Sequence, residues 1–165
     1  MPKIKIRNLG PIRKCDIDVN AFTVLTGAQA SGKSTLAKAI YFFRTLKTDV
    51  YEEITRRPSP EDYSDNMIDS LEKRIRSKFL RIFGSSWSMD NTMKLEYFYT
   101  SRMKLEIYLE PDRNHTYRNF VKVSFGEPLR DLVEKYERNT SDEYVWDQEE
   151  RRENLRKEIQ TVFAD

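Results

Sequence analysis

The chain has 165 residues, enough for one domain with a hydrophobic core or for a domain with a short extension. Its 29 basic and 27 acidic residues nearly balance, so no overall field requires a nucleic-acid partner. Cys15 is the only cysteine, which excludes a disulfide framework, and no apolar stretch approaches the ~20 residues of a membrane span. These features predict a cytoplasmic globular protein with no membrane partner.

Two alternating segments open the chain. In residues 4–7 and 15–19 apolar and polar side chains alternate as they do in strands, and Gly10-Pro11 between them favours a turn. We expect these two strands to pair as a hairpin. Residues 22–26 follow, and their β-branched and apolar side chains predict a buried strand.

The most informative motif comes directly after that segment. Residues 27–34 read Gly-Ala-Gln-Ala-Ser-Gly-Lys-Ser and match the phosphate-binding pattern G-x-x-x-x-G-K-[ST]. In such a loop successive backbone N–H groups hold phosphate oxygens, and the start of the following helix adds its positive dipole end. The apolar spacing of residues 34–43 predicts this helix, which is expected to run to about Lys47. The expected binding residues are Gly27, Ala28, Gln29, Ala30, Ser31, Gly32, Lys33, Ser34 and Thr35.

The chemistry of such loops gives a role to individual residues. Gly27 and Gly32 can adopt backbone angles that are closed to other residues. Lys33 is expected to contact the β- and γ-phosphates, and the Ser34 hydroxyl to ligate Mg²⁺, so ATP and Mg²⁺ are the predicted cofactors. The alternative is a strand-to-helix turn that contains glycine and is followed by an ordinary helical lysine.

A polar stretch and a second helix come next. Residues 48–66 include Pro58 and Pro60 and predict an excursion or linker. The apolar side chains of the following segment recur at helical intervals, and Gly84 is expected to close that helix. They are Met67, Leu71, Ile75, Phe79, Leu80 and Phe83.

Three segments of alternating β-forming side chains follow, residues 93–99, 103–109 and 117–125, and they predict an antiparallel meander. A helix is expected over residues 128–138.

The last segment, residues 141–165, predicts an amphipathic helix. Ser141 followed by two acidic residues is typical of a helix start. The helix reaches Asp165 without a stop signal, which favours a chain cut inside a longer element. Its apolar stripe is formed by Leu155, Ile159, Val162 and Phe163.

The stretches at residues 4–12, 16–19 and 23–40 together resemble the N-terminal lobe of ABC-type P-loop ATPases related to SMC and RecF proteins, within the AAA family. This broad group includes DNA-repair and phage-defence ATPases. The resemblance implies an α/β fold, a P-loop NTPase lobe with an antiparallel β-meander and C-terminal helices. In that group the chain leaves the ATPase head through long helices, and the segment at 141–163 resembles this departure. The implied division is a lobe over 1–140 and a helical extension over 141–165.

The departures from the family pattern concern catalysis. The family's signature loop, of the Leu-Ser-Gly-Gly type, needs adjacent glycines, and none of the five glycines here are adjacent. A Walker B element needs a buried strand that ends in Asp-Glu. The nearest candidate, residues 107–112, alternates with charged side chains and fits a half-exposed meander strand better. A metal-sensing glutamine is expected too, but neither Gln148 nor Gln160 can be assigned to that role.

Other features have a structural and a functional interpretation. Arg13 and Lys14 form a basic turn that favours solvent, although the resemblance allows an approach to the nucleotide. Basic residues at 56–57, at 151–152 and in the second helix favour a solvated surface over a DNA-binding one. The aromatic residues Tyr97, Phe98, Tyr99 and Tyr108 favour sheet packing over base stacking.

The leading hypothesis is therefore an Mg²⁺·ATP-binding lobe that hydrolyses ATP only when a missing C-terminal lobe or second subunit completes it and the heads dimerise. DNA is a weaker candidate partner. A small P-loop kinase acting on a nucleotide or metabolite is the alternative, but such kinases usually begin directly with the P-loop strand. A third hypothesis is a partner-binding module that binds no nucleotide.

Overall fold

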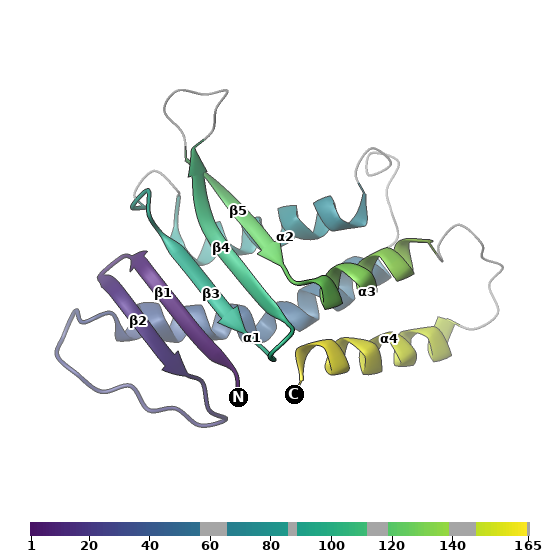
Figure 1. Cartoon of the computed structure of the whole chain (residues 1–165), viewed down its shortest axis with the longest axis horizontal. Helices are drawn as coiled ribbons and strands as arrows, with labels where there is room; N and C mark the ends of the chain where they lie inside the picture. Colours follow the sequence, from purple (N-terminus) through teal and green to yellow (C-terminus); the bar gives the residue numbers. More distant parts are fainter. Residues whose placement is uncertain (57–65, 86–88, 112–118, 139–147, 165) are drawn as a thin grey trace.

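The computed structural model describes residues 1–56, 66–85, 89–111, 119–138 and 148–164. Within these ranges the chain forms a five-stranded sheet and four helices (Figure 1). The strands are β1 (Lys3–Leu9), β2 (Ile12–Asp18), β3 (Lys94–Phe98), β4 (Lys104–Pro111) and β5 (Asn119–Phe125). The helices are α1 (Lys33–Thr55), α2 (Met67–Phe83), α3 (Glu127–Arg138) and α4 (Gln148–Phe163).

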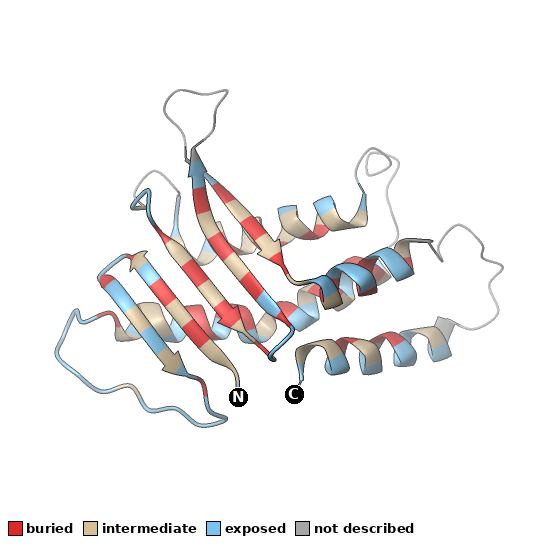
Figure 2. Cartoon of the chain, viewed as in Figure 1, coloured by how far each residue is buried: buried red, intermediate tan, exposed pale blue. Residues whose placement is uncertain are grey.

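The sheet is antiparallel throughout, with the strand order β2-β1-β3-β4-β5. The hairpin and the meander predicted from alternation are therefore confirmed, and β1 joins them by pairing with β3. Residues 117 and 118 of the predicted third meander strand lie outside the described residues. Helices cover one face of the sheet, and Figure 2 shows the resulting alternation of buried and more exposed residues along β1, β3, β4 and β5. In the edge strand β2 only Ile12 is buried.

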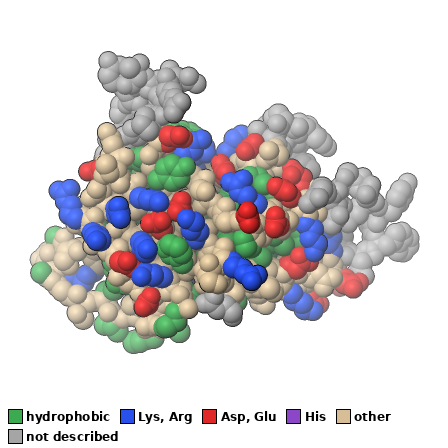
Figure 3. Space-filling model, viewed as in Figure 1, with side chains coloured by type: hydrophobic (Ala, Val, Ile, Leu, Met, Phe, Trp, Pro, Cys, Tyr) green, Lys and Arg blue, Asp and Glu red, His purple; other side chains and the backbone are tan. Residues whose placement is uncertain are grey.

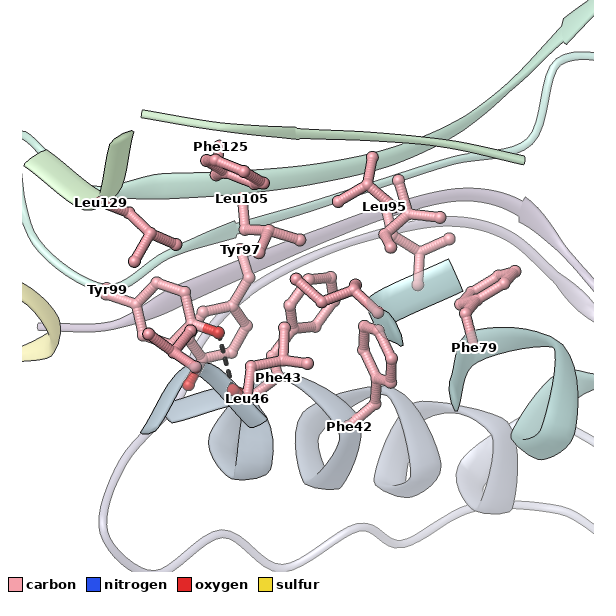
Figure 4. Close-up of a cluster of buried hydrophobic side chains, with 14 of the residues drawn as sticks. Phe42, Phe43, Leu46, Phe79, Leu95, Tyr97, Tyr99, Leu105, Phe125 and Leu129 are labelled. Carbon is pink, nitrogen blue, oxygen red and sulfur yellow. Dashed lines mark hydrogen bonds between the residues drawn. The ribbon is translucent and has the colours of Figure 1, made fainter. Parts of the chain in front are cut away.

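The core lies between the sheet and α1. Phe42 and Phe43 of α1 are fully buried, and the Phe43 ring stacks on Tyr97 of β3 at 5.0 Å between centroids (Figure 4). The Tyr99 hydroxyl donates a 2.6 Å hydrogen bond to the Phe43 carbonyl oxygen, so its polar end is satisfied inside the core. The preference for sheet packing is confirmed for Tyr97 and Tyr99, which are buried.

The helix α1 is longer than expected. Its residues 48–55 were predicted as the start of a polar linker, and that prediction is wrong. The reason is that Leu46, Val50 and Ile54 continue the buried stripe at intervals of four through otherwise polar sequence. The remainder of the predicted linker, 57–65, lies outside the described residues.

The second helix is confirmed, and Gly84 ends it, as expected. Its charged side chains are not all solvated. Lys78 and Arg74 turn toward Asp49 of α1 and form ion pairs with it, and the Lys78 side chain is only 12% exposed. The predicted solvated surface holds for the exposed Lys73 and Arg81 but not for Lys78, because α1 supplies a carboxylate that faces it.

The helix α3 is confirmed, and α4 packs on the body of the protein. Leu155 and Ile159 are buried, and the Phe163 ring contacts Tyr99 edge-on with 4.6 Å between centroids. Over its described residues this helix therefore lies against the domain, where the resemblance implied a departure from it. The predicted start at 141 lies outside the described residues. None of the described helices is long and apolar enough to cross a membrane.

Candidate nucleotide-binding site

The loop at residues 27–32 connects an extended segment to α1 and turns sharply three times. The backbone φ angle is +145° at Gly27, +61° at Ala30 and +92° at Gly32. Positive φ angles at closely spaced positions are typical of loops whose successive N–H groups converge on one side and bind anions. The sequence predicted such backbone angles for Gly27 and Gly32.

Ala30 was expected in the site but not in this conformation. An alanine with positive φ carries a backbone cost of about 1–2 kcal/mol. The cost is tolerated where the surrounding loop fixes the conformation, and such positions cluster at ligand-binding sites. No signal in the sequence distinguishes Ala30 from Ala28 in this respect.

The first turn of α1 offers unpaired donors. Gly32 is the N-cap residue and supplies no side chain, and no acidic residue lies in the first turn. The first bond of the helix runs from the Leu36 N–H to the Gly32 carbonyl oxygen at 2.9 Å. The N–H groups of the residues before Leu36 therefore have no acceptor within the helix, and they add to its positive dipole end. An anion is the chemically matched occupant.

Lys33 folds back over the loop. Its ammonium group donates to the Gly27 carbonyl oxygen at 2.8 Å, to the Ala28 carbonyl oxygen, and to the Ser31 Oγ at 3.3 Å. The charge thus lies against the loop backbone. A phosphate group bound there would compete with these neutral acceptors for the Lys33 ammonium group. The bond to the phosphate would be the stronger one, because donor and acceptor are then both charged.

The β1–β2 turn braces the loop from the other side. A β-carbon placed on Gly32 would lie 2.7 Å from Cγ1 of Ile12, so this position accepts only glycine without a shift of the turn. Gly10 belongs to the same turn. A β-carbon placed on it would lie 4.0 Å from the side chain of Thr35 in α1. The hairpin that precedes the loop in sequence is therefore part of its structural support.

A family model described as an AAA ATPase domain matches residues 1–163. The chain belongs to the AAA ATPase domain family. No curated protein and no solved structure matches it. Membership implies a P-loop NTPase that uses ATP and Mg²⁺, whereas the narrower resemblance to SMC and RecF proteins has no support from these comparisons.

In this AAA ATPase domain a pocket of about 500 Å³ lies beside the loop. Ser31, Gly32 and Lys33 line one side, and Arg13 and Lys14 at the start of β2 line another. The two basic residues are exposed, as predicted, yet they also face the candidate nucleotide site. Both interpretations of this turn thus agree with its position.

Cys15 lines the same pocket, and its surroundings disfavour the thiolate form. Partial burial, and secondarily the neighbouring Asp16 carboxylate, raise the pKa of its thiol. The thiolate fraction at neutral pH is therefore lower than that of an ordinary cysteine.

The residues present fit a magnesium ion that is held mainly by a nucleotide. Ser34 is the second residue of α1 and is exposed, so its hydroxyl is accessible. The described residues contain no cluster of three His, Cys, Asp or Glu side chains able to hold a metal. Mg²⁺ in P-loop sites takes few protein ligands and completes its octahedron with phosphate oxygens and water. One hydroxyl beside a phosphate site meets that requirement.

The extended segment before the loop differs from expectation. Residues 22–26 were predicted as a buried strand, and this prediction is wrong: they form no strand, and Phe22 and Val24 are 83% and 67% exposed. Their side chains have the propensity of a strand, but a strand needs a neighbour to pair with. None of the five described strands pairs with residues 22–26.

The predicted preference for a meander strand over a Walker B element at 107–112 is confirmed as far as Pro111. The strand β4 lies between β3 and β5 and is antiparallel to both. Glu110 near its end is exposed and lies 3.7 Å from the ammonium group of Lys122. It is thus an ordinary surface carboxylate on an antiparallel sheet, and Asp112 lies outside the described residues.

Proposed function

We propose that this AAA ATPase domain binds Mg²⁺·ATP through residues 27–35 and depends on a second lobe or subunit for hydrolysis. The observation that carries the proposal is the loop itself. Its backbone has positive φ at three positions, the helix behind it starts without a side-chain cap, and the Lys33 ammonium group donates to the loop carbonyl oxygens. Lys33 would leave the loop carbonyls for the β- and γ-phosphates, and Ser34 would ligate the Mg²⁺ ion, which neutralises phosphate charge.

The dependence on a second part is supported by the exposed apolar segment at 22–26. In a P-loop ATPase the segment before the loop is a strand of the catalytic sheet, and here its side chains have no such neighbours. Phosphoryl transfer also needs a residue that positions the attacking water. A lobe of the SMC/RecF-like ABC type, with a role in DNA repair or phage defence, is the specific form of this proposal.

Binding is tested by calorimetry of the purified chain with Mg²⁺·ATP. We expect saturable binding that Lys33→Ala weakens at least about tenfold, because a charged contact to the phosphates is lost. Lys38→Ala is the matched control, since Lys38 is an exposed lysine of the same helix that does not line the pocket. Turnover by the chain alone should be negligible for all three proteins.

Each other outcome contradicts a defined part of the proposal. Steady ATP hydrolysis that Lys33→Ala abolishes would show that the chain is complete on its own. Transfer of the phosphoryl group to a nucleotide or metabolite in a coupled assay would indicate a small kinase. Absence of both heat and thermal stabilisation by Mg²⁺·ATP would indicate a module that binds no nucleotide.

A further inference from the structure

The face of the sheet that the helices leave uncovered carries a row of cations. Arg7 of β1 lies directly opposite Lys14 of β2 on one side and Lys94 of β3 on the other. The row continues through Tyr108 of β4 to Lys122 of β5. We call Lys14, Arg7, Lys94 and Lys122, together with Tyr108, the cation row. Like charges that face each other directly across strands destabilise a sheet, so folding does not account for this arrangement.

The carboxylates on the same face neutralise only part of the row. Glu96 and Glu106 lie 3.2 and 3.4 Å from the Lys94 ammonium group, and Lys104 also contacts Glu106. Their charge is thus shared around Lys94. Glu110 lies 3.7 Å from the ammonium group of Lys122, in a pair whose side chains are 48% and 40% exposed, so that solvent screens it. Arg7 and Lys14 form no ion pair with any described residue, and both are exposed.

The neighbouring Asp16 is already bound to Lys3. The Lys3 ammonium group lies 2.9 Å from its carboxylate. The pKa of Asp16 is held below its usual range, first by the hydrogen bond from Lys3 and further by the charges of Lys3, Lys5 and Lys14. The surroundings of Arg7 and Lys14 are therefore basic even where an acid is present.

Figure 3 views this face. Lys and Arg side chains gather over the part of the sheet formed by β2, β1 and β3, with acidic side chains between them. Adjacent strands are about 4.8 Å apart, so the five positions of the row span about 19 Å. That is roughly the span of six or seven stacked nucleotides with a rise of about 3.4 Å each.

Aromatic side chains accompany the cations. Tyr108 is a member of the row and is half-buried, which leaves part of its ring accessible. Phe98 lies in the same face beside the row, with the Lys5 ammonium group 5.2 Å from its ring centre. A basic track with aromatic platforms is the arrangement that binds single-stranded nucleic acids without sequence preference.

We propose that the cation row binds the phosphate backbone of a single-stranded nucleic acid, with Tyr108 available for base stacking. Charge complementarity favours this ligand, because a polyanion relieves the repulsion between Arg7 and the facing Lys14 and Lys94. The row meets the candidate nucleotide pocket at Lys14, which lines both. Arg7 and Lys122 lie outside that pocket, so substitutions at these two positions test the row separately from ATP binding.

The test measures fluorescence anisotropy of a labelled oligothymidylate of about 20 nucleotides, which forms no duplex, with the whole chain. The variant is Arg7→Gln with Lys122→Gln. We expect it to bind about tenfold more weakly than the unaltered chain, and the slope of log affinity against log salt to fall by about 1.4, since two phosphate contacts are lost. Lys38→Gln with Lys47→Gln removes the same charge from exposed positions of α1 and should leave both values nearly unchanged.

Thermal unfolding and substitutions of Tyr108 test whether the loss of affinity comes from the cation row itself. Arg7→Gln should not lower the thermal unfolding midpoint, because it removes a repulsion and breaks no ion pair. Tyr108→Phe should retain affinity, whereas Tyr108→Thr should weaken it by several-fold. The proposal is overturned by the absence of oligothymidylate binding at about 50 mM salt. Equal weakening by the control variant, equal affinity for a blunt duplex, or binding only to vesicles rich in phosphatidylserine would overturn it as well.

Discussion

Gly32 joins two parts of the candidate site through a contact that leaves no room for a side chain. It has positive φ, it caps α1, and Ile12 of the β1–β2 turn lies against its α-carbon. The hairpin therefore holds the loop at the point where the phosphate-binding N–H groups begin. Lys33 then extends from the next residue back across the loop.

Replacement of Gly32 by alanine is expected to reduce both stability and nucleotide binding. The left-handed backbone costs about 1–2 kcal/mol for a residue with a β-carbon, and the clash with Ile12 must also move the turn. Gly84→Ala is a suitable control, because Gly84 also has positive φ but has nothing within 4 Å of the added carbon. We expect denaturant unfolding to detect a loss in both variants and Mg²⁺·ATP titration to detect a loss only in Gly32→Ala. Unchanged nucleotide binding in Gly32→Ala would show that the hairpin does not shape the loop.

At the scale of the elements, α1 organises the fold by contacting both the sheet and the other helices. Its aromatic face packs on β3, while its polar flank offers Asp49 to α2. The side chains of Asp49 and Lys78 are 13% and 12% exposed, so their ion pair is largely shielded from water. The Thr45 hydroxyl accepts a further hydrogen bond from Lys78 at 2.9 Å.

Asp49→Asn should destabilise the protein by about 2 kcal/mol, because two cations of α2 lose their shared carboxylate in a partly buried setting. The measurement is the free energy of unfolding in urea. Glu153→Gln is the control: its pair with Lys157 is about two-thirds exposed on α4, where solvent screens the interaction. A loss from Asp49→Asn no larger than that of the control would mean that the α1–α2 contact depends on apolar packing alone.

Periodicity predicted the strands whose pairing partners lie close in sequence and the helix whose apolar side chains recur at regular intervals. The hairpin, the meander and the second helix follow from alternation or from spacing of four, and the structure has them. The continuation of α1 through residues 48–55 escaped prediction, since only Val50 and Ile54 carry the apolar signal among polar residues. The inward turn of Arg74 and Lys78 depends on Asp49, 25 or more residues earlier in the chain, which no local pattern discloses.

The loop was identified by its eight-residue pattern, because the pattern states which positions need glycine, lysine and a hydroxyl. What the pattern could not supply is the conformation of Ala30, or the contact of Ile12 with Gly32. Both depend on how the chain folds around the loop. The role of these residues in binding remains a prediction for the experiments above.

At the scale of the whole molecule, the described sheet and helices enclose one hydrophobic core, and the segment at 22–26 stays outside it (Figure 2). Phe22 and Val24 expose most of their apolar surface next to the candidate site. Exposed apolar side chains with strand propensity favour association with another strand. The missing lobe proposed above would bury them; without it, chains are expected to self-associate.

The double change Phe22→Ser with Val24→Thr should therefore leave the thermal unfolding midpoint unchanged and raise the monomer fraction in sedimentation at high protein concentration. The midpoint is insensitive because substitutions at exposed positions usually change stability by less than about 0.5 kcal/mol. Phe42→Ala is the contrasting case: Phe42 is fully buried against Phe79, and its truncation should cost about 3–5 kcal/mol. If the double variant instead melts as early as Phe42→Ala, the segment contributes to the core of the isolated chain, and the proposal that it awaits a second lobe fails.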